Sequence, residues 1–269
     1  MLTDTQIETF RTQGFLNYGP VLTPDETVAL RDALTRTLSG KSDRKPETNR
    51  DIGGAHGIVV QIVNQWEVEP AFRTHLFHPK IVAMIAQLMG TDTVRVWHDQ
   101  VQIKPSHIGG PTIWHQDFPY WPVIAPAELV SAWVALEDAT VENGCMSMVP
   151  RSHKWGAYNG GTVGSIPGDW GPAHDAGFVP EGERVETVAC EVPAGGVVFH
   201  HCMTWHGAPP NYSVRGRPAI AVHYMPGHTR YEPTEKGHLV EQHISVKPGE
   251  LLVGEHFPTV MERGEILKG

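Results

Sequence analysis

The chain of 269 residues has little cysteine and none of the marks of an export signal. Its three cysteines, Cys145, Cys190 and Cys202, are odd in number and form no C-x-x-C pair, which excludes a disulfide framework. The opening residues, MLTDTQIETF, contain neither the basic nor the apolar stretch of a signal peptide. We therefore expect a cytoplasmic protein with free thiols.

Long apolar runs and excess positive charge are also missing. No stretch approaches the roughly 20 apolar residues that a membrane-spanning helix needs, so a membrane protein is not expected. With 21 Lys and Arg against 30 Asp and Glu, the net charge of -9 repels phosphate backbones, so nucleic acid is not an expected partner. Hydrophobic residues make up 40% of the chain, enough for a core, which excludes a disordered protein.

Glycine, proline and histidine are abundant instead. The chain has 28 glycines and 22 prolines, together 50 of 269 residues, or about 19% against an average near 12%. This excess indicates many turns and short strands. The 16 histidines, about 6% of the chain, direct attention to metal chemistry.

The pattern of elements changes along the chain. Capping residues and apolar periodicity predict helices that begin at Thr3, at Thr23 and at Pro79, within an N-terminal helical region of about 1–90. The polar run 41–51 is predicted to be a surface loop. Short β-branched, turn-bounded runs then predict strands. These are Val94–Lys104, Ser131–Ala139, Cys145–Pro150, Val185–Val192, Gly196–His201 and Ala219–Met225.

Helices that lead and strands that follow without helices between them favour an antiparallel sandwich or barrel. We expect a mainly β protein with flanking helices, organised as a single domain over residues 1–269 with its barrel at about 94–226.

One histidine, His115, begins an H-x-[DE] motif, His115-Gln116-Asp117. Residues i and i+2 of a strand point to the same face, so His115 and Asp117 can bind one cation. The best third ligand is His206, which follows a predicted strand and precedes a Gly-Ala-Pro-Pro turn. Two histidines and one carboxylate are typical of non-haem Fe(II) oxygenases, although zinc accepts the same ligands.

The choice of ligands leaves alternatives open. His200 and His201 stand near His206 and could replace it, although both lie in an apolar strand pattern. A structural His–Asp hydrogen bond is the other interpretation of His115 and Asp117.

A positively charged residue, Arg217, follows the third ligand in the sequence. Arg217 comes eleven residues after His206, at the start of a predicted strand. Its guanidinium could clamp a carboxylate, which would suit a dicarboxylic 2-oxo acid whose other end chelates the metal.

The sequence at this point resembles the phytanoyl-CoA dioxygenase family of Fe(II)/2-oxoglutarate-dependent oxygenases. The resemblance rests on WHQDFPYWP at Trp114–Pro122, SAWVALEDATVENGCMSMVPRSHKWG at Ser131–Gly156 and WHGAPPNYSVRGRPAIAVHY at Trp205–Tyr224. It implies a double-stranded β-helix, the jelly-roll or cupin-like barrel.

The same resemblance implies roles for individual residues. Iron would be held by His115, Asp117 and His206, and the far carboxylate of 2-oxoglutarate by Arg217. Gln116 and Trp133 match positions that line the co-substrate pocket. Where relatives often have a serine two residues after the distal histidine, this chain has Ala208.

Substrate contacts are less sharply indicated. Tyr120 and Trp121 lie next to the metal strand and are candidates. The Gly- and Pro-rich segment 155–184 is about twice the length of an ordinary loop, so we expect a lid over the barrel mouth in which Trp170, His174 and Phe178 contact substrate. A surface excursion without a role is the alternative.

The expected function is an Fe(II)- and 2-oxoglutarate-dependent dioxygenase that hydroxylates a small organic molecule, natural-product or amino-acid-derived, and releases succinate and CO2. O2 is the oxidant, and ascorbate is the expected reductant in vitro. A metal-binding cupin-like protein without oxygenase activity and a metal-dependent hydrolase on the same barrel are the alternatives. The chain has no basic cluster for an acyl-CoA, and a monomer or a homodimer is expected.

Overall fold

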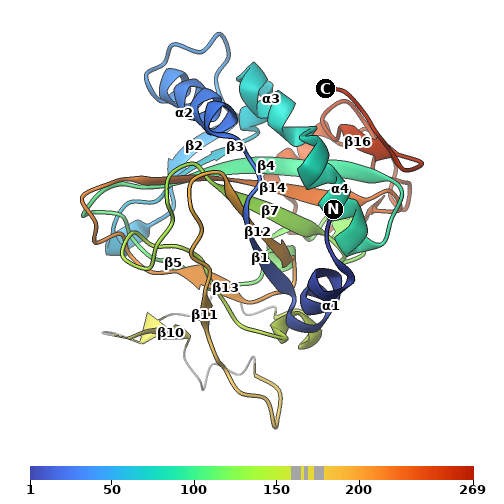
Figure 1. The fold of residues 1–269 in the computed structure, drawn as a ribbon. Helices are drawn as coiled ribbons and strands as arrows, with labels where there is room; N and C mark the ends of the chain where they lie inside the picture. The colour runs from blue at the N-terminus through green and yellow to red at the C-terminus, as the bar shows by residue number, and fades with distance from the viewer. Residues whose placement is uncertain (159–164, 167–168, 173–178) are drawn as a thin grey trace.

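The computed structural model describes residues 1–158, 165–166, 169–172 and 179–269 (Figure 1). Helices on the outside of a large antiparallel sheet, and a small sheet on its other side, make up the fold. The α-helices of the described chain are α1 (Asp4–Gln13), α2 (Pro24–Leu38), α3 (Pro70–Leu76) and α4 (Pro79–Met89). In the described residues, no helix has the length and apolar character needed to cross a membrane.

The helix starts follow from local hydrogen bonding. Thr3 and Thr23 each accept a bond from the backbone N–H three residues on, and the side chains of Gln6 and Glu26 bond back to the capping residues. These reciprocal bonds satisfy N–H groups that would otherwise lack partners. The short helix α3 was not predicted, because its seven residues hold too little periodicity to stand out.

Among the described residues the large sheet has nine strands. Its central order is β1 (Phe15–Pro20), β12 (Gly196–His201), β7 (Val130–Ala135), β14 (Arg217–Pro226), β4 (Val94–Lys104), β16 (Thr259–Glu262) and β17 (Glu265–Ile266). Two further strands extend it beside β4, namely β3 (Val60–Val63) and β2 (Thr48–Asp51).

The small sheet has the order β11 (Val188–Ala189), β8 (Ser147–Met148), β13 (His206–Ala208) and β5 (Thr112–His115). Two short pairs complete the strands, β6 (Ile124–Ala125) with β15 (Arg230–Tyr231) and β9 (Ser165–Ile166) with β10 (Asp169–Pro172). Within the described chain, the 3-10 helices are η1 (Gly54–His56), η2 (Gln65–Glu67), η3 (Phe118–Tyr120), η4 (Ser152–Lys154) and η5 (Leu239–His243).

Alternation along the strands separates two cores. Ile220 and Val222 of β14 and Val134 of β7 belong to the core beneath the helices. Ala221 and Trp133, one position along, belong to the core between the two sheets. Side chains of successive strand residues point to opposite faces, so one face of the large sheet is closed by helices and the other faces the small sheet.

The predicted jelly-roll fold is confirmed. In the part of the chain that the structure describes, the two sheets pair separately and face each other without closing into one hydrogen-bonded ring. The expected separation of an N-terminal helical region from the barrel near residue 90 is not sharp. Three strands from the N-terminal region, β1, β2 and β3, join the large sheet.

The prediction of a loop over 41–51 is wrong at its end. Thr48–Asp51 forms β2, an edge strand whose polar side chains carry no apolar alternation that would reveal it. The strands expected at 131–139, 145–150 and 185–192 are also shorter in the structure, where their ends are mostly bends and irregular backbone.

Candidate functional site

His115 and His206 are brought together by strand register. They are directly opposed partners on β5 and β13, and their rings lie 4.2 Å apart between centroids. Directly opposed residues of paired strands point to the same face. Asp117 follows β5 at the start of η3, where its backbone N–H donates to the carbonyl of Cys202.

The ligand atoms of His115, Asp117 and His206 all lie within 4.8 Å of one another. Each histidine Nδ1 is hydrogen bonded to a backbone carbonyl two residues earlier, that of Ile113 at 2.7 Å and that of Thr204 at 2.9 Å. Both Nε2 atoms lie 3.6 Å from Asp117 Oδ1. Bonds of this kind leave Nε2 free to bind a metal, and the donor set suits a divalent ion.

The charge state of the cluster also suits a metal. Burial raises the pKa of Asp117, but its electrostatic interactions with His206, His115 and His200 together hold that pKa well below its usual value. Burial and the neighbouring His115 lower the pKa of His206 well below its usual value. A carboxylate and an unprotonated imidazole are the forms that bind metals.

The second carboxylate oxygen of Asp117 is held by two other side chains. His200 Nε2 lies 3.0 Å from Oδ2, and Ser131 Oγ donates to the same oxygen at 3.3 Å. Ser131 also bonds His223 Nδ1 at 2.6 Å. His201, the other alternative ligand, instead accepts a bond from the backbone N–H of Met203, just after β12.

Arg217 lies in the same inner cavity as the cluster, as the spacing had indicated. Its side chain is 1% exposed, and no described residue accepts a bond from its Nε or Nη1. The guanidinium sits 5.1 Å from the ring centroid of Trp133, which lines the cavity too, as does Ala208. Burial lowers the pKa of Arg217 to about 10, so it is charged at neutral pH. A buried cation with unused donors is a site for an anion.

Gln116 is placed elsewhere. Its amide donates to the carbonyls of Gly156 and Met203 and accepts the backbone N–H of Tyr158. It lies outside the set of residues that line the cavity of Arg217, because it points to the opposite face from its neighbours His115 and Asp117. The structure thus differs from the expected co-substrate contact.

A second cavity of about 350 Å³ adjoins the cluster at His115 and Asp117. Tyr120 and Trp121, the two candidates for substrate contact, both line it. The other wall was not foreseen from the sequence. It consists of Arg50, Ile52, Gln61, Val63, His98, Gln100, Gln102, His238 and Leu239, with Pro111, Thr112 and Ile113. A signal was present in β4, where polar residues occupy alternate positions of an otherwise buried strand.

The segment 155–184 is described in part. Its ends pack on the outer face of the small sheet, where Trp155 and Val179 contact Trp114 and Trp205. Trp170 lies in β10, which pairs with β9. The residues His174 and Phe178 lie outside the described residues.

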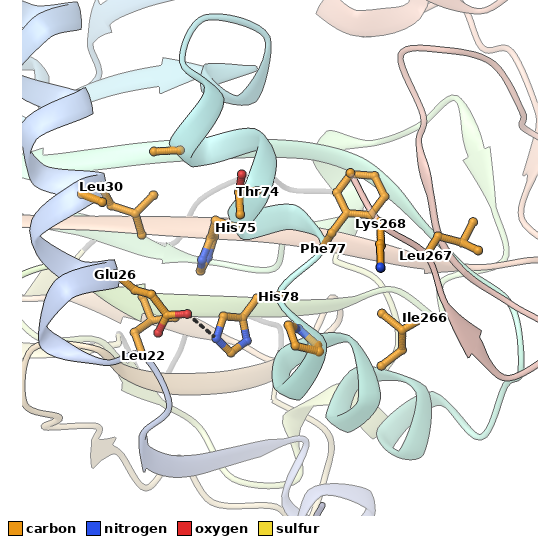
Figure 2. A pocket seen from close by; sticks show the side chains of 14 residues that line it. Leu22, Glu26, Leu30, Thr74, His75, Phe77, His78, Ile266, Leu267 and Lys268 are labelled. Atoms are coloured by element: carbon orange, nitrogen blue, oxygen red, sulfur yellow. Dashed lines mark ion pairs between the residues drawn. The ribbon is translucent and has the colours of Figure 1, made fainter.

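A larger cavity of about 660 Å³ lies between α2, α3, α4 and the C-terminal segment (Figure 2). Its lining is mostly apolar, with an ion pair of 3.4 Å between His78 and Glu26. It shares no residue with the two cavities at the histidine cluster and holds no described group of three metal-binding side chains, so size alone does not mark the reactive site.

Comparison with known proteins agrees with this geometry. A family model described as phytanoyl-CoA dioxygenase (PhyH) matches residues 10–219. A mouse (Mus musculus) protein, phytanoyl-CoA dioxygenase domain-containing protein 1, is 31% identical over 158 residues, which cover 58% of this chain and 53% of that protein. The chain thus spans about half the length of this curated relative.

Solved structures match over nearly the whole chain. The non-haem alpha-ketoglutarate-dependent carbocyclase SnoK from nogalamycin biosynthesis is 32% identical, covers 97% of both chains and has a TM-score of 0.79. The epimerase SnoN from the same biosynthesis is 24% identical, covers 95% of this chain and 97% of its own, and has a TM-score of 0.77, which supports the fold.

Proposed function

Because this chain belongs to the phytanoyl-CoA dioxygenase family, we propose that it is an Fe(II)- and 2-oxoglutarate-dependent oxygenase that hydroxylates a small organic molecule. The observation that carries the proposal is the buried Arg217, which has unused donors and lines the same cavity as His115, Asp117 and His206. A metal site alone would suit a storage protein or a hydrolase. A metal site paired with a buried anion site suits a 2-oxo diacid that binds both.

Each residue has a distinct part in this proposal. His115, Asp117 and His206 would hold Fe(II), which when bound supplies the O2 chemistry that converts 2-oxoglutarate to succinate and CO2 and gives one oxygen atom to the substrate. Arg217 binds the far carboxylate of 2-oxoglutarate. Trp133 and Ala208 wall this pocket and exclude water. Tyr120 and Trp121 contact the substrate in the adjoining cavity.

Hydroxylation is the proposed outcome, and the product assay must also detect other changes to the substrate. The similar structures include a carbocyclase and an epimerase, so ring closure and epimerisation are the natural competitors for the same site.

The test is incubation of purified protein with Fe(II), 2-oxoglutarate, ascorbate and O2, followed by measurement of succinate. Succinate should form in the wild type and disappear in His115→Ala, Asp117→Ala and His206→Ala, with circular dichroism unchanged. His201→Ala, whose side chain bonds a backbone N–H away from the cluster, is the matched control. Full turnover in His206→Ala would move the ligand to His200.

A further inference from the structure

One wall of the substrate cavity is a row of polar side chains. They come from β2, β3 and β4, which are neighbouring strands of the large sheet (Figure 1). Arg50 lies on β2, Gln61 on β3 and Gln100 on β4, and β3 pairs with both of the other strands. Tyr120 and Trp121 also line the cavity. Gln100 lines the inner cavity beside the metal ligands as well, so the row runs from the rim towards the reactive site.

The hydrogen bonds along this row have a fixed direction. Arg50 Nε and Nη2 donate to Gln61 Oε1 at 3.0 and 2.9 Å, and Gln61 Nε2 donates to Gln100 Oε1 at 2.8 Å. A guanidinium only donates, so Gln61 must turn its oxygen to Arg50 and its nitrogen to Gln100. Gln100 must then turn its oxygen to Gln61, which leaves its NH2 group for the cavity.

This NH2 group is a donor beside an apolar part of the cavity lining. Ile52, Val63, Leu239 and Trp121 contribute apolar lining to the same cavity. The cation at the outer end of the row polarises the two amides, which strengthens the last donor. A ligand that brings an acceptor to Gln100 and apolar surface to Trp121 satisfies both parts of the cavity at once.

We propose that the substrate carries a carbonyl or carboxylate oxygen on an apolar framework, with that oxygen bound by the Gln100 amide beside the metal ligands. The inference rests on the proposed function, because it assigns the substrate class of the same site. Arg50 and Gln61 are positioning residues that set the orientation of Gln100.

Three naphthalene probes test the inference, since they share one ring system and differ in the acceptor. 2-Acetylnaphthalene, 2-naphthoate and 2-ethylnaphthalene are titrated calorimetrically, under argon, into protein loaded with Fe(II) and 2-oxoglutarate. At least one oxygenated probe should bind about fivefold to tenfold more tightly than the ethyl compound. Whichever oxygenated probe binds more tightly shows whether the site prefers a carbonyl or a carboxylate.

Two variants of nearly equal size separate the donor from the shape of the cavity. Gln100→Met removes the donor, and Gln100→Glu keeps the acceptor for Gln61 while replacing the donor with a carboxylate oxygen. Both should abolish the preference, and Gln100→Glu should also repel 2-naphthoate. Gln87→Met, on α4 and bonded to the Leu2 backbone, is the control and should retain the preference.

Equal binding of the three probes, no binding of any probe, or a preference that survives in Gln100→Met would overturn the inference. Because the titrations require no turnover, the proposed function is tested separately. A protein that prefers the oxygenated probes and forms no succinate refutes the oxygenase and leaves the assignment of the acceptor in place.

Discussion

At the scale of single residues, the candidate site depends on side chains whose hydrogen bonds are either completed or left open. His115 and His206 have one ring nitrogen each committed to a backbone carbonyl, so the other can serve only the metal position. Arg217 shows the reverse, because burial has taken it from water without giving Nε and Nη1 an acceptor. A buried cation of this kind lowers the stability of the fold unless an anion accepts its unused hydrogen bonds.

Replacing Arg217 should therefore weaken co-substrate binding strongly. Loss of a bidentate pair in a dry cavity costs about 2–5 kcal/mol, so Arg217→Ala should raise the Michaelis constant for 2-oxoglutarate roughly 30-fold or more. Arg217→Lys should restore only part, since an ammonium lacks the planar fork. The exposed Arg215 provides the matched control, Arg215→Ala. An unchanged constant in Arg217→Ala would contradict the assignment.

We expect His200 to act on the metal through Asp117. Its Nε2 lies 3.0 Å from the carboxylate oxygen that faces away from the two histidine ligands. Groups in this position orient the ligand, and their loss commonly lowers metal affinity about 10- to 100-fold. We expect His200→Ala to show this loss in Co(II) titrations followed by absorbance, with His201→Ala close to wild type. Equal affinities in the two variants would make His200 a packing residue only.

At the scale of elements, a buried lysine holds the end of β13 in place. Lys104, at the end of β4, donates to the carbonyls of Gly110, Ala208 and Pro209 at 2.7–3.0 Å. Burial and the neighbouring Arg217 lower the pKa of Lys104 well below its usual value. The bonds tie the strand that carries His206 to the large sheet.

Lys104→Met should destabilise the fold, because it leaves buried carbonyls without a donor at about 1–3 kcal/mol each. The free energy of unfolding, measured in urea, should fall by several kcal/mol on this scale, while Lys154→Met, an exposed lysine on η4, should change little. If Lys104→Met unfolds at the same urea concentration as the wild type, water replaces the ammonium group without loss of stability.

Two segments are candidates for a lid over the substrate cavity. Leu239 of η5 lines the cavity directly, and the described ends of segment 155–184 pack on the far face of the small sheet. We expect Leu239→Ala to uncouple the reaction, so that succinate forms and oxidised substrate falls. Trp170→Ala and Phe178→Ala test the insertion in the same assay. If both keep the wild-type ratio of product to succinate, the insertion is no lid.

At the scale of the whole molecule, the three cysteines report on global unfolding. Cys145, Cys190 and Cys202 are free and fully buried. Burial raises the pKa of Cys145 to about 11 and raises the pKa values of Cys190 and Cys202 as well, so the reactive thiolate is scarce at pH 8. Ellman's reagent should find no fast thiol in the native protein and three in guanidinium chloride. A fast native thiol would contradict the packing.

The sequence predicted the parts of the site that depend on short-range rules. His115 and Asp117 stand two apart, and His206 and Arg217 follow in an order that a strand and a turn explain. Arg50 and Leu239 were beyond such rules, because each reaches the cavity only through the pairing of β2 at the sheet edge or the packing of η5. Gln116 was misplaced because strand parity was not applied to it.

The inner and outer cavities share a small set of lining residues, and this arrangement has an evolutionary consequence. The inner cavity is built on central strands and is joined to the outer one mainly through His115, Asp117, Thr112 and the β4 glutamines. The outer rim comes from an edge strand and from short helices, which tolerate exchange better than a core does. Descendants of such a chain can acquire new substrates by mutation at the rim while the residues of the proposed oxygenase site are inherited unchanged, and directed evolution of this protein should begin there.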